Sequence, residues 1–421
     1  EDGDNYYYVD INGVMASNQW VAIENEDAGE DDEPEHYWYY FQANGKALTN
    51  GDNDKVSLKT INGKKYAFDD EGKMLYGWVD DASAERLDNT DGDGFKDADY
   101  YFGGEDDGAM TTGWLQLDIT YDEATNDDYK YTAAAFNDDE DQTRWFYFKA
   151  NGKKVKAENG DYQKEKTING KKYAFDQYGA MTAEWSLDKD EITDKASSSN
   201  PIPASNSSAG SVDVDAKYAQ QWRYFNSVED GSRVSKGWFK VVPSADFDES
   251  NNDDENEKWY YANGDGTLEA NKISKIKGKY YAFNEKGAML SGLIRMTVNS
   301  DDTINVLDDG VDADELDDLI NDKTSGGSLY YFGDGEDGSM KLGVQTVTLD
   351  GDNYSFFFTK TGGIEEKGAG LTGKYNKVLY KYGKKIKAEA DDKYLVVKFD
   401  ESANTIEVVS SKDLRADTRS Y

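Results

Sequence analysis

The fold is decided by one ten-residue stretch, Thr60-Ile61-Asn62-Gly63-Lys64-Lys65-Tyr66-Ala67-Phe68-Asp69. It returns unchanged at 167–176 and in a modified form at 276–284. In each copy, two short runs rich in aromatic and β-branched residues flank a dipeptide ending in glycine, which predicts a tight β-hairpin. A single hairpin cannot bury a core in water, so the copies are expected to stack on their neighbours.

Two further hairpin types lie between these copies. One has Tyr-Tyr-Phe, an acidic glycine turn and a methionine (100–110 and 330–340), and the other has Trp-aromatic-Tyr-Phe before Gly-Lys (38–46 and 145–153). The three types recur in a constant order, with 107 residues from Tyr66 to its counterpart Tyr173. The repeat predicts an all-β solenoid of roughly twelve stacked β-hairpin repeats in triplets.

Long, mostly acidic inserts separate the hairpins. All four prolines fall in these inserts, as expected because proline removes a donor from a strand ladder. The inserts cover 24–36, 80–98, 118–144, 186–221, 243–257 and 297–327.

The inserts and chain ends suggest a domain division. A Ser- and Pro-rich loop is expected at 196–211, one short helix within 311–320, and a cap with strands at 393–399 and 405–410. The predicted parts are a first repeat array of two triplets (1–185), an insert (186–221), a second array of two triplets (222–390) and a C-terminal β-hairpin cap (391–421).

The composition excludes several classes of function. The chain has 47 Lys and Arg against 85 Asp and Glu, for a net charge of −38, so nucleic acid and anionic lipid are poor partners. Without cysteine there are no disulfides or thiolate sites. His36 is the only histidine and is expected on the surface, and no catalytic motif is evident, so an enzyme is not expected. The 57 aromatic residues (31 Tyr, 17 Phe and 9 Trp) argue against disorder.

The nine tryptophans occupy two positions of the repeat. Four lead a first strand, and five follow a second strand, with Trp20, Trp78, Trp114, Trp185 and Trp238 in this latter group. They can serve as packing between hairpins, or they can leave half-open aromatic pockets for quaternary ammonium groups or sugars. Both interpretations stay open at this point.

Several of these motifs resemble a known family. The dipeptides Gly77-Trp78, Gly113-Trp114 and Gly237-Trp238, the run 38–41 and the Gly-x-Met spacing look like the cell-wall-binding repeats of Gram-positive surface proteins. That group includes choline-binding modules and glucan-binding repeats. The resemblance implies a hairpin solenoid on a secreted or cell-surface protein that attaches to wall polymers or glycans. It implies aromatic pockets built from Trp20, Trp38, Tyr40, Trp78, Trp114, Trp145, Tyr147, Trp185, Trp238, Trp259 and Tyr261, with Met74 and Met110.

The chain departs from the choline-binding pattern in two ways. Lys65 and Lys172 stand where a leading aromatic is expected, and Ala67 and Ala174 replace the second tyrosine. Long inserts also interrupt repeats that run close together in choline binders. These departures favour a glycan ligand, or a few surviving pockets, over a regular ladder of choline cages.

Calcium is the one metal that the sequence suggests. Oxygen-bearing side chains alternate around Gly92 and Gly94, although Tyr100 replaces the glutamate that usually closes such a loop. The candidate ligands are Asn89, Asp91, Asp93, Asp97 and Asp99, and a solvated acidic loop is the alternative.

The leading hypothesis is therefore non-catalytic binding of a cell-wall polymer or surface glycan, which anchors a secreted or surface protein. A choline-binding module is one alternative. A structural spacer or adhesin with a protein partner is another, and it would place the function in the inserts. The chain begins at Glu1 rather than Met and shows no signal peptide, so we expect an excised or mature segment, for which a neighbouring domain is one candidate partner. No stretch is long enough for a transmembrane helix.

Overall fold

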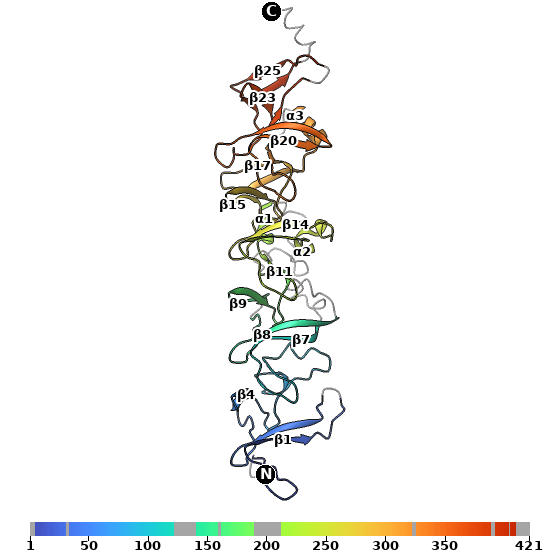
Figure 1. The fold of residues 1–421 in the computed structure, drawn as a ribbon, viewed down its shortest axis with the longest axis vertical. Helices are drawn as coiled ribbons and strands as arrows, with labels where there is room; N and C mark the ends of the chain where they lie inside the picture. The colour runs from blue at the N-terminus through green and yellow to red at the C-terminus, as the bar shows by residue number, and fades with distance from the viewer. Residues whose placement is uncertain are drawn as a thin grey trace, which may run out of the picture. The chain divides into compact units, whose positions relative to one another are not determined.

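The computed structural model describes residues 5–30, 33–121, 140–158, 161–188, 212–321, 326–388, 392–403 and 405–409. In these residues the chain forms short antiparallel strands in small sheets, mostly of two strands, with few helices (Figure 1). The prediction of an all-β chain of hairpins is confirmed in this form. The chain divides into two compact units, of which unit 1 is Glu1–Asp190 with Trp222–Val234, and unit 2 is Glu191–Gln221 with Ser235–Tyr421.

Unit 1 contains six antiparallel strand pairs among its described residues. Strand β12 pairs with β11, so residues 222–234 belong to unit 1 rather than to the second array expected from the sequence. The pairs are β1 (Gln19–Glu24) with β2 (His36–Phe41), β3 (Lys59–Ile61) with β4 (Lys64–Tyr66), β5 (Gly77–Val79) with β6 (Tyr100–Phe102), β7 (Gly113–Tyr121) with β8 (Glu140–Phe148), β9 (Lys164–Ile168) with β10 (Lys171–Phe175), and β11 (Glu184–Leu187) with β12 (Trp222–Phe225).

Unit 2 adds two larger sheets to the same kind of strand pair. The pairs are β13 (Gly237–Val241) with β14 (Lys258–Ala262), β15 (Lys272–Ile276) with β16 (Lys279–Phe283), and β25 (Val397–Asp400) with β26 (Thr405–Val408). The larger sheets follow the order β18 (Ile304–Asp309), β17 (Leu293–Val298), β19 (Ser328–Tyr331), and the order β20 (Gly343–Leu349), β21 (Asp352–Phe358), β24 (Lys384–Lys385), β23 (Val378–Lys381), β22 (Gly373–Tyr375).

The Asn-Gly-Lys stretches form the tight hairpins that the sequence predicts. In the first copy, β3 and β4 are joined by Asn62 and Gly63, whose φ angles are 48° and 83°. Two consecutive positive φ angles match the twist of a hairpin, and asparagine and glycine tolerate them best. The same arrangement joins β9 to β10 and β15 to β16.

The other two hairpin types differ from the expectation. Their tight turns close with a single bridge, as between Phe41 and Ala47 or between Phe102 and Met110. The longer ladders instead join the strand after one turn to the aromatic strand of the next repeat, as β1 joins β2 across the insert. The inserts are therefore the loops of these longer hairpins.

Consecutive repeats are linked by a recurring backbone hydrogen bond. The backbone N–H of the residue at the methionine position donates to the backbone carbonyl of a residue on the aromatic strand of the preceding repeat. Met181 donates to Trp145 at 2.8 Å in unit 1, and Met289 donates to Trp259 at 2.8 Å in unit 2. Stacking of neighbouring repeats is thus built into the backbone as well as the side chains.

Methionine side chains complete this contact. Six of the seven methionines pack against a turn glycine of the following repeat, where an added Cβ would collide with the thioether. Glycine is needed there both for its positive φ and for this close approach. The pairs are Met15 with Gly45, Met74 with Gly108, Met110 with Gly152, Met181 with Gly231, Met289 with Gly338 and Met340 with Gly368.

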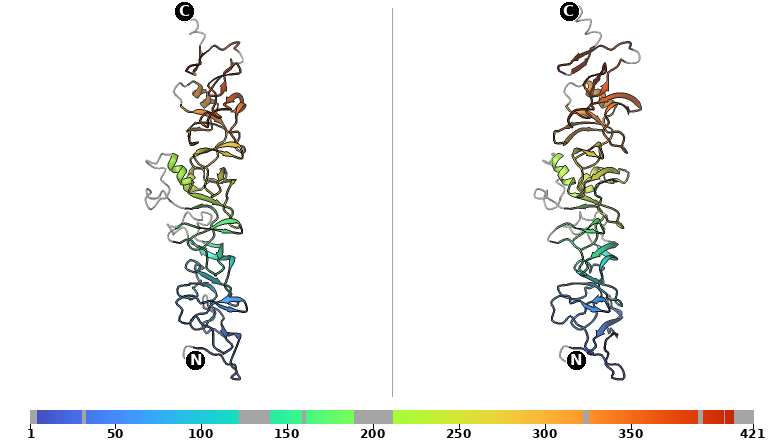
Figure 2. Two further views of the ribbon diagram at one scale, coloured as in Figure 1. Left: turned by 90° about the vertical axis from the view of Figure 1, so that its left-hand side faces the viewer. Right: turned by 60° about the vertical axis from the view of Figure 1, so that its left-hand side comes forward.

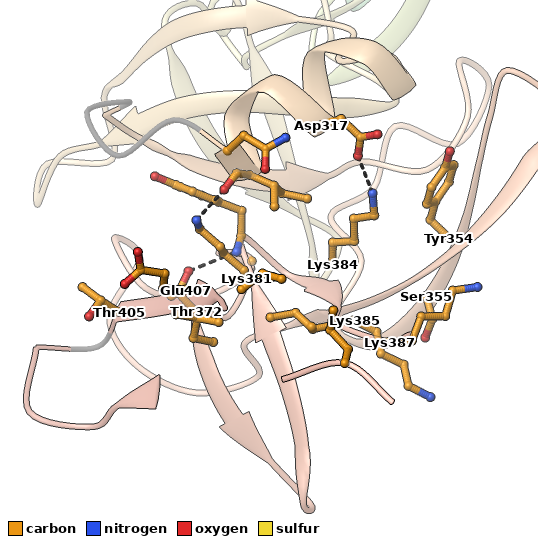
Figure 3. Close-up of a pocket in the computed structure, with 18 of the residues that line it drawn as sticks. Asp317, Tyr354, Ser355, Thr372, Lys381, Lys384, Lys385, Lys387, Thr405 and Glu407 are labelled. Atoms are coloured by element: carbon orange, nitrogen blue, oxygen red, sulfur yellow. Dashed lines mark hydrogen bonds and ion pairs between the residues drawn. The ribbon is translucent and has the colours of Figure 1, made fainter. Parts of the chain in front are cut away.

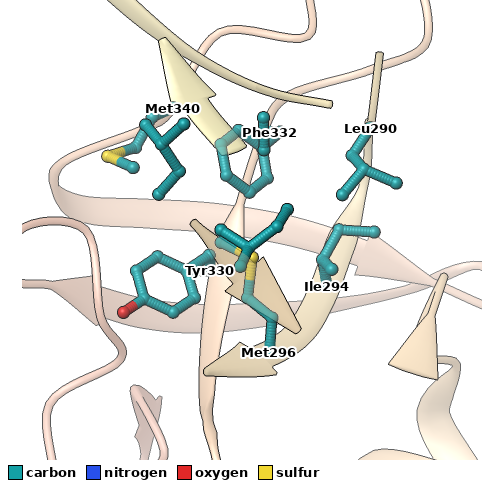
Figure 4. Close-up of a cluster of buried hydrophobic side chains, with 9 residues drawn as sticks. Leu290, Ile294, Met296, Tyr330, Phe332 and Met340 are labelled. Atoms are coloured by element: carbon teal, nitrogen blue, oxygen red, sulfur yellow. The ribbon is translucent and has the colours of Figure 1, made fainter. Parts of the chain in front are cut away.

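The cores are small and local to neighbouring repeats. One cluster in unit 2 gathers side chains from three consecutive repeats, with Leu290, Ile294, Met296, Tyr330, Phe332 and Met340 (Figure 4). No single large core is needed, because each repeat buries its aromatic strand against the next.

The expectation of one short helix is wrong. Helix α3 (Ala313–Asn321) forms as predicted and buries Leu316 and Leu319, but the described residues contain two more helices, α1 (Val212–Ala219) and α2 (Ala245–Asp248), and one 3-10 turn, η3 (Glu249–Asn251). Both extra helices lie in inserts, and α1 lies at the side of the strands of unit 2 (Figure 2). Helix α2 has only four residues, too few for a periodic apolar pattern, and α1 contains few large apolar residues.

The predicted cap hairpin forms as β25 and β26, although its first strand starts later than expected. The predicted Ser- and Pro-rich loop at 196–211 lies outside the described residues.

Candidate functional site

Each of the five tryptophans that follow a turn lies opposite a tyrosine on the paired strand. The ring centres are 4.9–5.2 Å apart with edge-to-face geometry, which is favourable for aromatic pairs. The strand register fixes these pairs as Trp20 with Tyr40, Trp78 with Tyr101, Trp114 with Tyr147, Trp185 with Tyr224 and Trp238 with Tyr261.

Three of these pairs grow into larger clusters of the same design. In each, the next repeat adds a second tyrosine 4.7–5.0 Å from the tryptophan and a phenylalanine at 5.7–5.8 Å. A second tryptophan lies on the paired strand, two residues before the first tyrosine. Cluster A is Trp20, Trp38, Tyr40, Tyr66 and Phe68, cluster B is Trp114, Trp145, Tyr147, Tyr173 and Phe175, and cluster C is Trp238, Trp259, Tyr261, Tyr281 and Phe283.

The tryptophan rings of the three clusters are half-buried. Cluster B illustrates this, because Trp114, Trp145, Tyr147 and Tyr173 each keep part of their surface exposed while Phe175 is fully buried. The phenylalanine and the strand backbone therefore fix the rings, and the remaining ring surface is available to a ligand.

A carboxylate lies beside each cluster. The Nε1–H of this second tryptophan donates to an acidic side chain from the glycine turn of a later repeat. The three bonds join Trp38 to Asp106 at 2.9 Å, Trp145 to Glu229 at 3.4 Å and Trp259 to Glu336 at 3.3 Å. All three acids stand two residues before a turn glycine.

The next residue in each turn braces the turn. It is an aspartate that forms an ion pair with the lysine of the Gly-Lys turn, and the pairs are Lys64 with Asp107 at 3.2 Å, Lys171 with Asp230 at 3.3 Å and Lys279 with Asp337 at 3.8 Å. The position of the carboxylate is thus fixed by backbone, indole and ion pair together.

The three carboxylates differ in their other partners. Asp106 also lies 3.0 Å from Nε2 of His36, whose side chain is partly exposed. The hydrogen bonds from Trp38 and then His36 hold the pKa of Asp106 below its usual value. Glu336 accepts a hydrogen bond from Lys240 at 3.0 Å, and this bond, followed by that from Trp259, lowers its pKa.

The cluster around Trp78 is covered by other side chains of the protein. Phe146 and Phe148 take the places of the second tyrosine and the phenylalanine, and Lys154 takes the methionine position. The Lys154 ammonium lies 5.3 Å from the centre of the Trp78 ring and donates to the carbonyl of Phe95. Trp78 is only 3% exposed, so the Lys154 side chain fills the space beside its ring and the rings of this cluster are inaccessible.

Two other predicted elements of the pockets lie elsewhere. Trp185 is 5% exposed and belongs to the core. Met74 is buried beside cluster A, whereas Met110 packs near Tyr100 and Phe102, outside the three clusters. The structure thus groups Trp20, Trp38, Tyr40, Trp114, Trp145, Tyr147, Trp238, Trp259 and Tyr261 into accessible clusters and separates Trp78, Trp185 and Met110 from them.

Sequence reasoning missed the second tyrosine and the carboxylate of each cluster. Tyr66, Tyr173 and Tyr281 belong to the stretch that defines the repeat, so their recurrence was visible, but their role depends on stacking with another hairpin. Asp106, Glu229 and Glu336 share one offset from the turn glycine, which is the signal that could have found them.

Two of the proposed calcium ligands form ion pairs with lysines. Asp93 lies 3.6 Å from Lys96 and Asp99 lies 3.3 Å from Lys156, while Asn89 accepts a hydrogen bond from the Gly94 N–H. In the part of the chain that the structure describes, no three His, Cys, Asp or Glu side chains form a group that could hold a metal ion. The calcium site stays a prediction.

No protein-family model matches the chain, and no curated protein matches its sequence. Similar solved structures exist. Choline binding protein F from Streptococcus pneumoniae is 17% identical over 92% of this chain and 91% of its own, with a TM-score of 0.27. The modular autolysin LytC from the same organism is 16% identical, with a TM-score of 0.29, and this chain covers 53% of its length. The choline-binding domain of CbpL, also from S. pneumoniae, is 18% identical over 69% of this chain and 93% of its own, with a TM-score of 0.31.

These structures include choline-binding proteins, the group that the sequence motifs resemble. At these identities and TM-scores the likeness carries no argument about what this chain binds. None of the helices in the described residues is long and apolar enough to cross a membrane.

Proposed function

We propose that this chain is a non-catalytic binding protein that holds a cell-wall polymer or surface glycan through clusters A, B and C. The proposal rests on one observation, the recurrence of the same five-ring arrangement with the same carboxylate at three places in the chain. Packing alone explains why rings recur, but it does not explain a charged side chain kept at one position beside each half-exposed tryptophan.

The chemistry of the clusters favours an ammonium-bearing group on that polymer. Aromatic faces attract quaternary ammonium through the ring quadrupole, and a nearby carboxylate adds a counter-charge. The Trp78 cluster supports this choice, since the chain's own Lys154 ammonium lies over the ring there. A choline-like group would occupy the equivalent space in the open clusters, and a neutral sugar would use the ring faces without needing the charge.

Three clusters in one chain suit a polymer with repeated groups. Each half-exposed cluster offers little contact area, so a single group is expected to bind weakly. Once one group is bound, the others reach the remaining clusters at high effective concentration, which raises the overall affinity without new contacts.

The finer architecture belongs to the same proposal. A solenoid of about twelve hairpins in triplets, on a secreted or cell-surface protein, would present the clusters at intervals along a polymer. The spacer or adhesin alternative would place the function in the inserts instead.

Retention on purified Gram-positive cell walls tests this function. We expect the full chain to be retained and to be released by choline chloride more effectively than by soluble glucans. Replacing Trp20, Trp114 and Trp238 together by leucine should abolish retention. The matched control is Tyr394→Ser, an aromatic that is 77% exposed and lies outside the clusters, which should leave retention unchanged. Equal retention of both variants would show that the clusters are packing only.

A further inference from the structure

The carboxylates of clusters A, B and C have different neighbours. Glu336 of cluster C accepts a hydrogen bond from Lys240 at 3.0 Å, whereas Glu229 of cluster B forms no ion pair with any described lysine, arginine or histidine. At cluster A the neighbour of Asp106 is His36, the only histidine in the chain. Histidine is the side chain whose charge ordinarily changes between about pH 5 and 8, so cluster A differs from the other two in this pH range.

The imidazole of His36 is held against the carboxylate of cluster A. Its Nε2 lies 3.0 Å from Oδ1 of Asp106, the same oxygen that accepts the Nε1–H of Trp38 at 2.9 Å. The rings of His36 and Trp38 lie edge-to-face with their centres 5.4 Å apart. A carboxylate only accepts hydrogen bonds, so Nε2 carries a hydrogen in the neutral and in the protonated ring. Protonation at Nδ1 therefore adds a charge while this contact stays in place.

The residue at this strand position differs among the three clusters. Two positions before the tryptophan that bonds the carboxylate stand His36 in cluster A, Thr143 in cluster B and Glu257 in cluster C. Thr143 donates to Asp118 at 2.6 Å, and Glu257 lies 4.0 Å from Lys240. Neither threonine nor glutamate ordinarily changes its charge between about pH 5.5 and 8, so clusters B and C are internal controls for cluster A.

The other charged groups around His36 keep their charge over this range. The hydrogen bonds from Trp38 and then His36 hold the pKa of Asp106 below its usual value. Carboxylates ordinarily ionise near about pH 4 and lysines near about pH 10, which leaves His36 as the group that titrates at this cluster. The charged residues on the elements around it are Glu24, which is opposite His36 in the ladder of β1 and β2, Glu35, Glu105, Asp106, and Asp107 with its ion-pair partner Lys64.

We propose that His36 makes cation binding at cluster A depend on pH, so that the cluster binds an ammonium group when the ring is neutral and releases it when the ring is protonated. This inference rests on the proposed function of the clusters. The neutral ring leaves the charge of Asp106 to the ligand. The protonated ring places a second cation beside the same carboxylate and repels the ligand. Because the two equilibria are linked, a bound cation in turn holds His36 neutral to lower pH.

Acid would therefore weaken one cluster of the three. A polymer held by all three clusters gains its affinity from simultaneous contacts, so the loss of one contact speeds its dissociation. Clusters B and C would keep a residual hold that does not respond to acid.

A cavity of about 1480 Å³ in unit 2 is a second place for a small cation, but its cation-binding groups are already used (Figure 3). The ammonium of Lys384 lies 2.6 Å from the carboxylate of Asp317 and 4.8 Å from the centre of the Tyr354 ring. The one histidine of the chain belongs to unit 1, so a cation bound in this cavity would not respond to mild acid. The pH dependence thus distinguishes cluster A from the cavity.

The first test isolates cluster A in the full chain by replacing Trp114 and Trp238 with leucine. Its affinity for choline, followed by tryptophan fluorescence at about 50 mM NaCl, should be about fivefold weaker at about pH 5.5 than at about pH 8, as expected for one exposed charge. Adding His36→Gln should make the affinity equal at the two pH values. The matched control isolates cluster B by replacing Trp20 and Trp238, and its affinity should change by less than about 1.5-fold.

The second test observes His36 directly in the wild-type chain. Labelling with 13C-histidine gives a single ring signal in the NMR spectrum, because the chain has one histidine. Saturating choline should move the midpoint of its pH titration down by about 0.7 pH unit, the logarithm of the fivefold change in affinity. In Trp20→Leu, which damages cluster A, choline should leave the midpoint where it is.

The outcomes separate this inference from the proposed function. Equal choline affinity of cluster A at both pH values, or a pH dependence that survives His36→Gln, would overturn the role of His36, while binding at cluster B would leave the proposed function standing. Absence of choline binding at both isolated clusters would contradict the function and the inference together. Binding that persists after Trp20, Trp114 and Trp238 are all replaced, and that ignores pH, would place the ligand in the cavity and overturn both.

Discussion

The Nζ atom of Lys154 lies 5.3 Å from the centre of the Trp78 ring and 5.9 Å from that of Phe146, in the core of unit 1. At the equivalent position of the next copy of the repeat, Met181 packs in cluster B. Burial lowers the pKa of Lys154 from 10.5 to about 7. Desolvation of this ammonium therefore opposes folding, while the ring faces and the Phe95 carbonyl offset part of the cost.

We expect Lys154→Met to stabilise the protein at pH 6, by an amount on the order of 3 kcal/mol. The lysine is protonated in both the folded and unfolded states below pH 7, so its penalty is present in full there. Between about pH 7 and 10.5 only the unfolded state keeps the proton, so wild-type stability gains with pH and the advantage of the variant shrinks. Denaturant unfolding at pH 6 and pH 10 measures this, with exposed Lys149→Met as the control. A variant less stable than wild type at pH 6 would show that the ring contacts outweigh desolvation.

Lys240 competes with a cationic ligand for the carboxylate of cluster C. Its ammonium lies 3.0 Å from Glu336, the carboxylate that a cationic ligand would use. Lys240→Gln should therefore increase the affinity of cluster C for choline by about fivefold, as expected for one exposed ion pair. Titration of intrinsic tryptophan fluorescence in a variant with Trp20 and Trp114 replaced by leucine isolates cluster C. The nearby exposed Lys236→Gln controls for net charge, and an equal gain there would contradict the competition.

Glu229 is the carboxylate of cluster B, and no lysine, arginine or histidine of the described chain forms an ion pair with it. Glu229→Gln keeps the shape of the side chain and removes its charge, so choline binding at cluster B should weaken by about fivefold. Binding of a neutral sugar should change little. The neighbouring Asp230→Asn loses the same charge away from the indole and should have a smaller effect. If both variants bind choline as the wild type does, the carboxylate has no part in recognition.

The contact between Met110 and Gly152 tests the stacking of repeats. Gly152 has a φ of +85° and meets the Met110 thioether and Tyr100, whereas Gly170 has a φ of +82° with open space around it. Gly170→Ala should cost about 1 kcal/mol from backbone strain alone, and Gly152→Ala about 2 kcal/mol more because of the collision. Chemical denaturation compares the two. Adding Met110→Ala to Gly152→Ala should recover part of the lost stability. Equal losses for Gly152→Ala and Gly170→Ala would mean that the Met110 side chain moves aside at no cost.

The local elements of the fold could be predicted from the sequence. The Asn-Gly turns, the aromatic strands and the amphipathic pattern of Leu316 and Leu319 are short-range signals, and each corresponds to an element of the structure. The pairing of β1 with β2 was harder to predict because an insert separates the two strands. No sequence motif near Trp20 indicates that its cross-strand partner is Tyr40.

The candidate site shows the same limit. The recurrence of Trp114 and Tyr147 was visible, but whether a tryptophan ends half-exposed depends on the residue that the next repeat supplies. Lys154 fills the space beside Trp78, and this is decided by a residue 76 positions later in the chain. Burial of Trp78 therefore could not be deduced from its own motif.

The most direct test of the proposed function is a count of bound ligand. Equilibrium dialysis of the full chain against radiolabelled choline should give three bound molecules per chain, one for each of clusters A, B and C. Trp114→Leu should reduce the number to two without unfolding the protein. The Trp78 cluster should bind no choline in the wild type or in this variant, because Lys154 fills it. No bound choline, or a number unchanged after Trp20, Trp114 and Trp238 are all replaced, would contradict the assignment of these clusters as cation-binding sites.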